Sequence, residues 1–272
     1  MVKITRITTQ KNDDKRLNIY IDDGAGEKFG FGIDMDVFVN YNLKKGLELD
    51  DRLIGELLYE DEVKKAFQQA LNYLSYRIRS QKEIEDHLVK KEFGESVIAA
   101  VIQRLYGYKY IDDAEFAKAY VRTKKRTTTK GPNVLKRELI EKGLSGQHID
   151  MGLQEYSMEE QVEVANAYVR KKGKQSKKQS NSEAKQKLKQ TLLQKGFSYE
   201  IIEIALTEFV NDEDRGEEWE ALMHHGKKAQ KKYRNYNDKE FVMKVKQYLY
   251  RKGFLMEHIN QWIQEYLETD EM

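Results

Sequence analysis

Apolar residues recur along the chain in a pattern that stops and restarts at nearly regular intervals. Four segments share it: LVKKEFGESVI (88–98), LIEKGLSGQHI (139–149), LLQKGFSYEII (192–202) and LYRKGFLMEHI (249–259). Aligned on the residue after Lys-Gly or Lys-Glu, the copies are separated by 51, 53 and 57 residues. Self-similarity of this period predicts a chain built from tandem repeats.

The aligned positions are apolar in every copy. They fall five residues before the alignment point (Leu88, Leu139, Leu192, Leu249), at that point (Phe93, Leu144, Phe197, Phe254), and five, nine and twelve residues after it (Ile98, Ile149, Ile202, Ile259; Ile102, Leu153, Leu206, Ile263; Leu105, Tyr156, Phe209, Tyr266). The later spacings follow one face of an α-helix. Each copy is therefore predicted to end one helix and to begin the next.

The break between the two helices carries the signal of a helix stop. Glycine often takes the left-handed conformation just past a helix end, and an apolar residue beyond it folds back onto the last turn. Gly143, Gly196 and Gly253 fit that role. The first copy has Glu92 instead. A left-handed residue other than glycine costs about 1–2 kcal/mol, so this turn is expected to differ.

A further helical stretch precedes each copy. These stretches are 62–79, 112–126, 159–174 and 217–234. Each module then has three helices, none of which buries its apolar face alone. Stacking of neighbouring modules supplies the missing core, as in other repeat proteins.

The first fifty residues follow a different pattern. Apolar and polar residues alternate as in strands over 4–10, 16–23 and 27–34, with a glycine-rich turn at 24–26 and a helix near 35–45. The expected fold is mainly α, an elongated array of tandem three-helix, helix-turn-helix-like repeats after a small N-terminal antiparallel β element. The predicted domains are 1–50 for the β segment and 51–107, 108–157, 158–211 and 212–272 for four three-helix repeats.

The composition agrees with a helical assembly that has a large solvated surface. Of the 272 residues, 39% are hydrophobic and 35% are charged, a mix too charged for one compact globule. No apolar run reaches the ~18 residues of a membrane span, and the first residues lack the apolar stretch of a signal peptide. The absence of cysteine excludes disulfides and thiol chemistry. We expect a cytoplasmic protein without membrane association.

Motifs for catalysis or cofactor binding are weak. The stretch GAGEKFG (24–30) departs from the dinucleotide-binding glycine pattern and precedes a strand, which favours a hairpin turn. Asp112 and Glu115 fit a helix cap better than an acidic site. The adjacent His224 and His225 point in different directions on a helix. We therefore expect no enzyme activity, no cofactor and no metal site.

The net charge is only +2, but the charges are segregated. Residues 118–137 hold eight Lys or Arg and no acid, and residues 168–195 hold ten against one acid, whereas residues 200–220 hold nine acids against one base. One such basic cluster is usually a solvated face. Recurrence near the end of each module's first helix favours contact with a phosphate backbone. The predicted DNA- or filament-binding residues are Arg77, Arg79, Arg122, Lys124, Lys125, Arg126, Lys130, Arg170, Lys171, Lys172 and Lys174.

The middle of the chain resembles the RecX family of recombinase regulators. The resemblance lies in ALNYLSYRIRSQKEIEDHLVKKEF (70–93) and YIDDAEFAKAYVRTKKRTTTKGPNVLKRELIEKGL (110–144). Its most specific parts are Asp112-Asp113 before Phe116-Ala117, and Lys130-Gly131-Pro132 before a helix that ends in Lys142-Gly143-Leu144. It is best over 62–157 and weaker over 158–272. The N-terminal strands and the fourth module indicate a long form of the family.

The resemblance implies a non-enzymatic modulator of RecA. Family members are elongated tandem three-helix repeats that lie in the groove of the RecA filament on single-stranded DNA. There they lower its ATPase and strand-exchange activity, and some bind DNA themselves. A role in homologous recombination, DNA repair and the SOS response follows. The implied partners are the RecA nucleoprotein filament and single-stranded as well as double-stranded DNA, and we expect a monomer.

Two other classes of protein stay open. A helix-turn-helix transcription factor would prefer one DNA sequence and bind dimeric half-sites. A helical protein-interaction scaffold would show no salt-sensitive binding to nucleic acid. The ATPase of RecA on single-stranded DNA, measured with and without this protein, separates both classes from a RecA modulator.

The repeat pattern makes a prediction about size in solution. A compact protein of this length has a radius of gyration of about 18–19 Å, and a tandem array exceeds it because each module contacts only its neighbours. Small-angle X-ray scattering measures this radius. A value near that of the compact protein would contradict the array.

Overall fold

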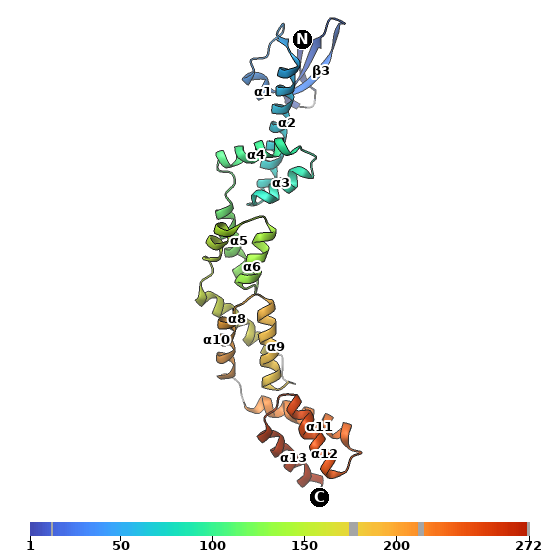
Figure 1. Ribbon diagram of the computed structural model, residues 1–272, viewed down its shortest axis with the longest axis vertical. Helices are drawn as coiled ribbons and strands as arrows, with labels where there is room; N and C mark the ends of the chain where they lie inside the picture. Colours follow the sequence, from blue (N-terminus) through green and yellow to red (C-terminus); the bar gives the residue numbers. More distant parts are fainter. Residues whose placement is uncertain (12, 174–178, 212–214, 271–272) are drawn as a thin grey trace. The chain divides into compact units, whose positions relative to one another are not determined.

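The computed structural model describes residues 1–11, 13–173, 179–211 and 215–270. The chain forms two compact units. Unit 1 comprises Met1–Phe116 together with Lys142–Leu144, and unit 2 comprises Ala117–Glu141 and Ser145–Met272. Figure 1 labels the helices and strands of both units.

Unit 1 begins with a four-stranded antiparallel sheet. The strands are β1 (Val2–Gln10), β2 (Asp13–Asp22), β3 (Glu27–Asp34) and β4 (Glu48–Leu49), in the order β3-β2-β1-β4, and α1 (Met35–Asn40) follows β3. The predicted turn between β2 and β3 is confirmed, with left-handed Gly24 and Gly26 at φ of 99° and 114°. Alternate apolar side chains are buried on one face, as the period of a strand requires: Ile4, Leu17, Ile19, Phe31 and Ile33.

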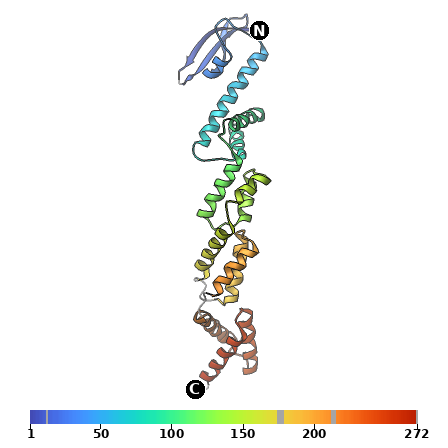
Figure 2. The same cartoon turned by 90° about the vertical axis from the view of Figure 1, so that its left-hand side faces the viewer.

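A buried ion pair fixes the sheet to α2 (Asp51–Leu74). The guanidinium of Arg16 in β2 donates two hydrogen bonds, of 3.0 and 2.9 Å, to the carboxylate of Asp61 in α2. The backbone N–H of Asp34 donates to the same carboxylate at 2.7 Å. Burial opposes ionisation of Asp61, but the hydrogen bonds from Arg16 and Lys65 outweigh it and hold the pKa of Asp61 below its usual value. Figure 2 shows the strands beside the N-terminal half of α2.

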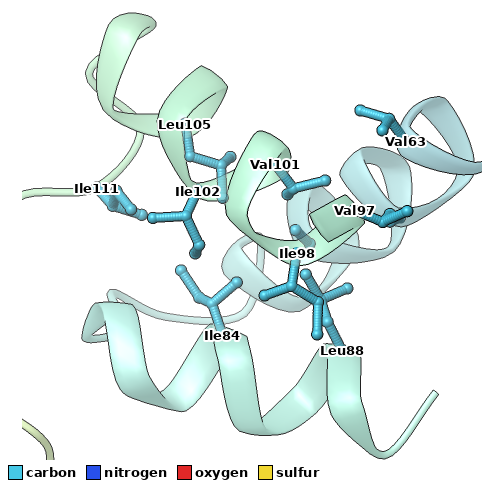
Figure 3. Close-up of a cluster of buried hydrophobic side chains, with 11 residues drawn as sticks. Val63, Ile84, Leu88, Val97, Ile98, Val101, Ile102, Leu105 and Ile111 are labelled. Carbon is cyan, nitrogen blue, oxygen red and sulfur yellow. The ribbon is translucent and has the colours of Figure 1, made fainter. Parts of the chain in front are cut away.

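The first three-helix group completes unit 1. It consists of α2, α3 (Gln81–Val89) and α4 (Glu95–Gly107). Its core is apolar, and Figure 3 shows Ile84 and Leu88 of α3 directed toward Ile98 and Ile102 of α4. These four side chains are at most 7% exposed, as the alignment of the copies predicts for three of them.

Unit 2 contains most of the remaining helices, which have the following bounds: α5 (Asp113–Thr127, beginning in unit 1), α6 (Pro132–Glu141), α7 (Gly146–Leu153), α8 (Met158–Gly173), α9 (Asn181–Gln194), α10 (Tyr199–Asn211), α11 (Arg215–Tyr233), α12 (Asp238–Arg251) and α13 (Met256–Asp270). The helices α8, α9 and α10, which are labelled in Figure 1, pack around one apolar core, and α11, α12 and α13 pack around another. The predicted class is confirmed: tandem three-helix groups after a small antiparallel sheet. Phe209 is the one aligned apolar residue whose side chain lies outside the described part.

The predicted helix stops are present in all four copies. Gly143, Gly196 and Gly253 are left-handed, with φ of 85°, 89° and 87°. The backbone N–H of Phe197 reaches back to the carbonyl of Leu192 at 3.1 Å, and Phe254 does the same with Leu249. The expectation of a different turn in the first copy is wrong, because Glu92 adopts a φ of 65° and Phe93 still donates to Leu88 at 3.3 Å. Packing of the apolar pair outweighs the left-handed strain.

Three of the four stops contact the start of an earlier helix. The carbonyl of Lys142 accepts a 2.8 Å hydrogen bond from the hydroxyl of Ser80, the N-cap residue of α3. The carbonyl of Lys195 accepts a 2.7 Å bond from the backbone N–H of Gly131, just before α6. The carbonyl of Lys252 accepts one from the hydroxyl of Ser180, the N-cap residue of α9. Each of these three stops thus bonds to the residue that immediately precedes the corresponding helix in the copy before it.

Close approach adds a second reason for glycine at these stops. A Cβ at Gly143 would lie 2.5 Å from the Cβ of Lys82, and one at Gly196 would lie 2.5 Å from the backbone nitrogen of Val134. Such distances cannot be accommodated without moving the backbone or a neighbouring side chain. Glu92 belongs to the first copy, where no earlier copy lies against the stop, and it is exposed. Glycine is therefore dispensable there.

A substitution tests the two reasons for glycine at the stop together. Gly196→Ala introduces left-handed strain and a clash with the backbone of Val134, so the free energy of unfolding should fall by about 1–3 kcal/mol. Chemical denaturation followed by circular dichroism measures the change. The control is Gly146→Ala at the first position of α7, where the space is open and the stability should stay the same or rise slightly. An unchanged midpoint for the Gly196 variant would contradict the assignment.

Candidate nucleic-acid interface

The predicted cations of unit 2 lie near the C-terminal ends of two helices. Lys124, Lys125 and Arg126 lie in the last turn of α5, and Arg170, Lys171 and Lys172 lie in the last turn of α8. Cations are favourable at this end because the helix dipole places partial negative charge there. Lys174 lies outside the described residues. The position alone therefore gives these side chains a structural role as well as a candidate binding role.

Two cations of α5 bind the segment that leads into α8. The guanidinium of Arg122 donates two hydrogen bonds of 2.7 Å to the carboxylate of Glu155. The ammonium of Lys125 lies 2.6 Å from the carboxylate of Glu160 and also donates to the carbonyl of Glu155. The side chain of Lys125 is only 13% exposed. These two contacts hold the start of α8 against α5.

Lys130 joins α5 and α6 through a shared carboxylate. Its ammonium pairs with the carboxylate of Glu138, which also accepts a 2.9 Å hydrogen bond from the hydroxyl of Tyr120. Burial works against ionisation of Glu138, but the hydrogen bonds from Lys130 and Tyr120 keep the pKa of Glu138 below its usual value. Lys130 is therefore an internal ion-pair partner in this structure.

In unit 1, Arg77 is also held by a carboxylate. Its guanidinium bonds to the carboxylate of Glu83 at 2.8 and 3.1 Å, and Lys142 bonds to the same group at 2.7 Å. Burial disfavours the charged form of Glu83, but these two cations prevail and lower its pKa from 4.5 to about 2. Glu83 also accepts from the backbone N–H of Ser80 in a capping box. The cluster joins the start of α3 to the residue after α6.

The remaining predicted cations are exposed to solvent or lie beside an aromatic ring. Arg126 and Lys171 are exposed, and Lys124 is half-exposed with its ammonium 5.3 Å from the ring centre of Tyr120. Within the described part of the chain, no carboxylate forms an ion pair with these three. Arg170 and Lys172 are exposed on α8. Arg79 lies over the ring of Tyr73 at 3.9 Å. The interface itself stays a prediction.

The acidic pair before α5 has two different roles. Asp112 caps the helix, as predicted, by accepting hydrogen bonds from the backbone N–H groups of Ala114 and Glu115 at 2.8 and 3.1 Å. Asp113 is 9% exposed and accepts a 2.9 Å bond from the backbone N–H of Gln81, the first residue of α3. Sequence reasoning missed the second role, since its partner lies 32 residues away in the chain.

Among the described residues, no group of three or more His, Cys, Asp or Glu is placed to hold a metal ion. No helix in that part of the chain combines the length and the apolar character that a membrane crossing requires.

The fold defines a class: a protein of tandem three-helix repeats with an N-terminal sheet. Comparison with known families matches five segments of the chain. Residues 2–50 match the Regulatory protein RecX N-terminal domain, 66–105 the first RecX three-helix domain and 112–153 the second. The third three-helix domain matches twice, at 159–206 and 216–263. The chain belongs to the RecX family of regulatory proteins.

Relatives share this organisation over almost the whole chain. The chain is 48% identical to "Regulatory protein RecX" of Bacillus licheniformis over 97% of its own length and 99% of the relative. It is 49% identical to the protein of that name from Bacillus subtilis, over 96% and 98%. A crystal structure of regulatory protein RecX superposes with a TM-score of 0.66 at 33% identity, covering 75% of this chain and 98% of that one. RecX from Lactobacillus salivarius gives 0.53 and 37%, covering 55% and 97%.

The Glu83 cluster gives a prediction for stability and pH. The folded pKa of about 2 lies below the ordinary 4.5, so the cluster stabilises the protein above pH ~4.5 and loses that contribution as the pH falls toward ~2. Glu83→Gln should lower the free energy of unfolding by roughly 1–2 kcal/mol at neutral pH, since partial exposure reduces the ~3 kcal/mol that the shift alone implies. Denaturation at several pH values measures the difference from the parent.

Glu203→Gln is the matched control for this test. Glu203 pairs with Lys189, but both side chains are at least 40% exposed, so its loss should barely change the stability. A difference between the Glu83 variant and the parent that persists unchanged at pH ~2 would contradict the assigned pKa.

Proposed function

We propose that this protein is a non-enzymatic regulator that binds the RecA filament on single-stranded DNA and lowers its ATPase and strand-exchange activity. It would thereby regulate homologous recombination and DNA repair. Membership in the RecX family supports this proposal, as does the name of the relatives, "Regulatory protein RecX". The protein acts in the cytoplasm as a monomer and uses no cofactor.

The single observation that carries the proposal is the set of cations that internal ion pairs leave available. Arg126 and Lys171 are exposed, Lys124 is half-exposed, and no described carboxylate pairs with them. A flexible ammonium or guanidinium in water neutralises a phosphate without first breaking an internal contact. Lys125 is a poorer candidate, because binding a phosphate would leave the carboxylate of Glu160 unpaired.

The proposal includes a division of the chain into domains. We divide the chain into a β segment (1–50) and four three-helix repeats (51–107, 108–157, 158–211 and 212–272). The second and third repeats supply the available cations of α5 and α8. Single-stranded DNA is the main nucleic-acid partner, and double-stranded DNA offers the same phosphates.

A reversal of three charges tests the function. The variant Lys124→Glu/Arg126→Glu/Lys171→Glu replaces attraction to phosphate by repulsion and leaves the internal ion pairs intact. Binding to single-stranded DNA and inhibition of RecA ATPase should both weaken. The log–log dependence of DNA affinity on salt should flatten by roughly one unit for each lost phosphate contact.

The control reverses three exposed lysines of the N-terminal segment: Lys11, Lys44 and Lys45. It changes the net charge by the same amount, so an equal loss would assign the effect to overall charge. Inhibition that stays at the parent level in the folded triple variant would contradict the proposed surface. A strong preference for one duplex sequence would instead favour a transcription factor, and no salt-sensitive binding to any nucleic acid would favour a protein scaffold.

A further inference from the structure

The side chains of Tyr73, Arg79 and His87 form a stack in the first three-helix group. Tyr73 belongs to α2, Arg79 to the segment after α2, and His87 to α3. The guanidinium carbon of Arg79 lies 3.9 Å from the ring centre of Tyr73. On the same tyrosine, the imidazole of His87 stacks at 4.1 Å with an angle of 2° between the planes. The tyrosine ring thus holds both basic groups in fixed positions.

Positive charge is concentrated around this stack. His87 is followed along the chain by Lys90 and Lys91, which are both exposed. Burial lowers the pKa of His87, and the charges of Lys91, Arg79 and Lys90 lower it further. Asp86, the acid that precedes His87 in the chain, lies 3.6 Å from the ammonium of Lys82. Glu92 follows the cluster and is exposed.

The cations of this cluster differ from the neighbouring Arg77, which has a carboxylate partner. Arg77 is bound by the carboxylate of Glu83. In the described residues, by contrast, the Nε of Arg79 is buried without a hydrogen-bond partner, and no carboxylate pairs with Arg79, Lys90 or Lys91. Like charges that no carboxylate pairs with repel each other and are stabilised by a bound anion. The arrangement therefore favours an anionic ligand.

We propose that Arg79, His87, Lys90 and Lys91 form a phosphate-binding site for the backbone of single-stranded DNA. This inference rests on the proposed function and places a nucleic-acid contact in unit 1. The guanidinium of Arg79 is planar and fixed by the tyrosine, so its N–H groups match two phosphate oxygens with little loss of entropy. Lys90 and Lys91 add mobile point charges, which suit a backbone read without regard to base sequence.

The histidine makes binding at this site depend on pH. Without a ligand, burial and then the neighbouring cations keep the pKa of His87 below its usual value. A bound phosphate offsets those cations and raises that pKa, so the complex takes up a proton. Linkage then requires tighter binding as the pH falls through the range between the two pKa values, by at most about tenfold per pH unit.

Fluorescence anisotropy with a labelled oligothymidine and the full-length protein tests the site. Lys90→Gln/Lys91→Gln should weaken binding on the order of tenfold or more at ~0.05 M salt and lower the salt slope by about two units. Lys44→Gln/Lys45→Gln removes another adjacent pair of exposed lysines and should leave both quantities near the parent's. Equal effects of the two double variants, or an unchanged salt slope for the first, would overturn the site.

Two further measurements use groups in the stack. The parent should bind more tightly at pH ~6 than at pH ~8, on either side of the ordinary histidine pKa, and His87→Gln should remove that difference. Arg79→Lys keeps the charge but not the planar fork, and should weaken binding if the guanidinium contacts phosphate. Parent binding that does not change with pH would overturn the role of His87. Circular dichroism verifies that each variant is folded.

Competition distinguishes the possible ligands and the two proposals. Polyglutamate that displaces the oligothymidine as well as unlabelled DNA does would assign the site to an acidic protein surface and overturn the proposal. If the parent neither binds DNA nor inhibits RecA, both the proposed function and this site fail. If the parent does both and the Lys90/Lys91 variant matches it, only this site fails.

Discussion

The contact between a helix stop and the start of an earlier helix explains why the later copies of the repeat have glycine at the stop. The last carbonyls and first N–H groups of a helix lack partners within that helix. Ser80 satisfies one of each, because its hydroxyl accepts from the backbone N–H of Glu83 and donates to the carbonyl of Lys142. The chain must approach closely for this bond. Gly143 permits that approach, since a Cβ there would collide with Lys82.

The helical pattern could be predicted because the aligned residues are buried within single groups of helices. Leu88, Leu139, Leu192 and Leu249 are all fully buried, and their spacing is local in sequence. The start of α2, by contrast, does not follow from the apolar pattern. The helix begins at Asp51, after the N-cap Asp50, whereas the apolar period indicates a start near residue 62. Its first turns pack on the sheet through Leu57 and the Arg16–Asp61 pair, a contact that no local period contains.

The turn at Glu92 shows how propensity and packing compete. A left-handed glutamate is unfavourable by about 1–2 kcal/mol, which made a different turn the natural expectation. Phe93 and Leu88 nevertheless pack in the first core as their counterparts do in the later copies. Full burial of a large apolar side chain contributes about 1.5–3 kcal/mol, so the fully buried Leu88 together with the partly buried Phe93 offsets the strain. The backbone therefore keeps the conformation of the repeat although the residue changes.

A short window of sequence also fails to show which charges are paired in the folded protein. Residues 118–137 contain no acid, yet Arg122 and Lys125 meet carboxylates 33 and 35 residues away. A window of sequence therefore overestimates the positive charge that is available to a ligand. A phosphate that bound Lys125 would have to displace the carboxylate of Glu160 and the carbonyl of Glu155 from an ammonium whose side chain is only 13% exposed. Cations without internal partners carry no such penalty. Recognition of a polyanion thus depends on the cations that folding does not use.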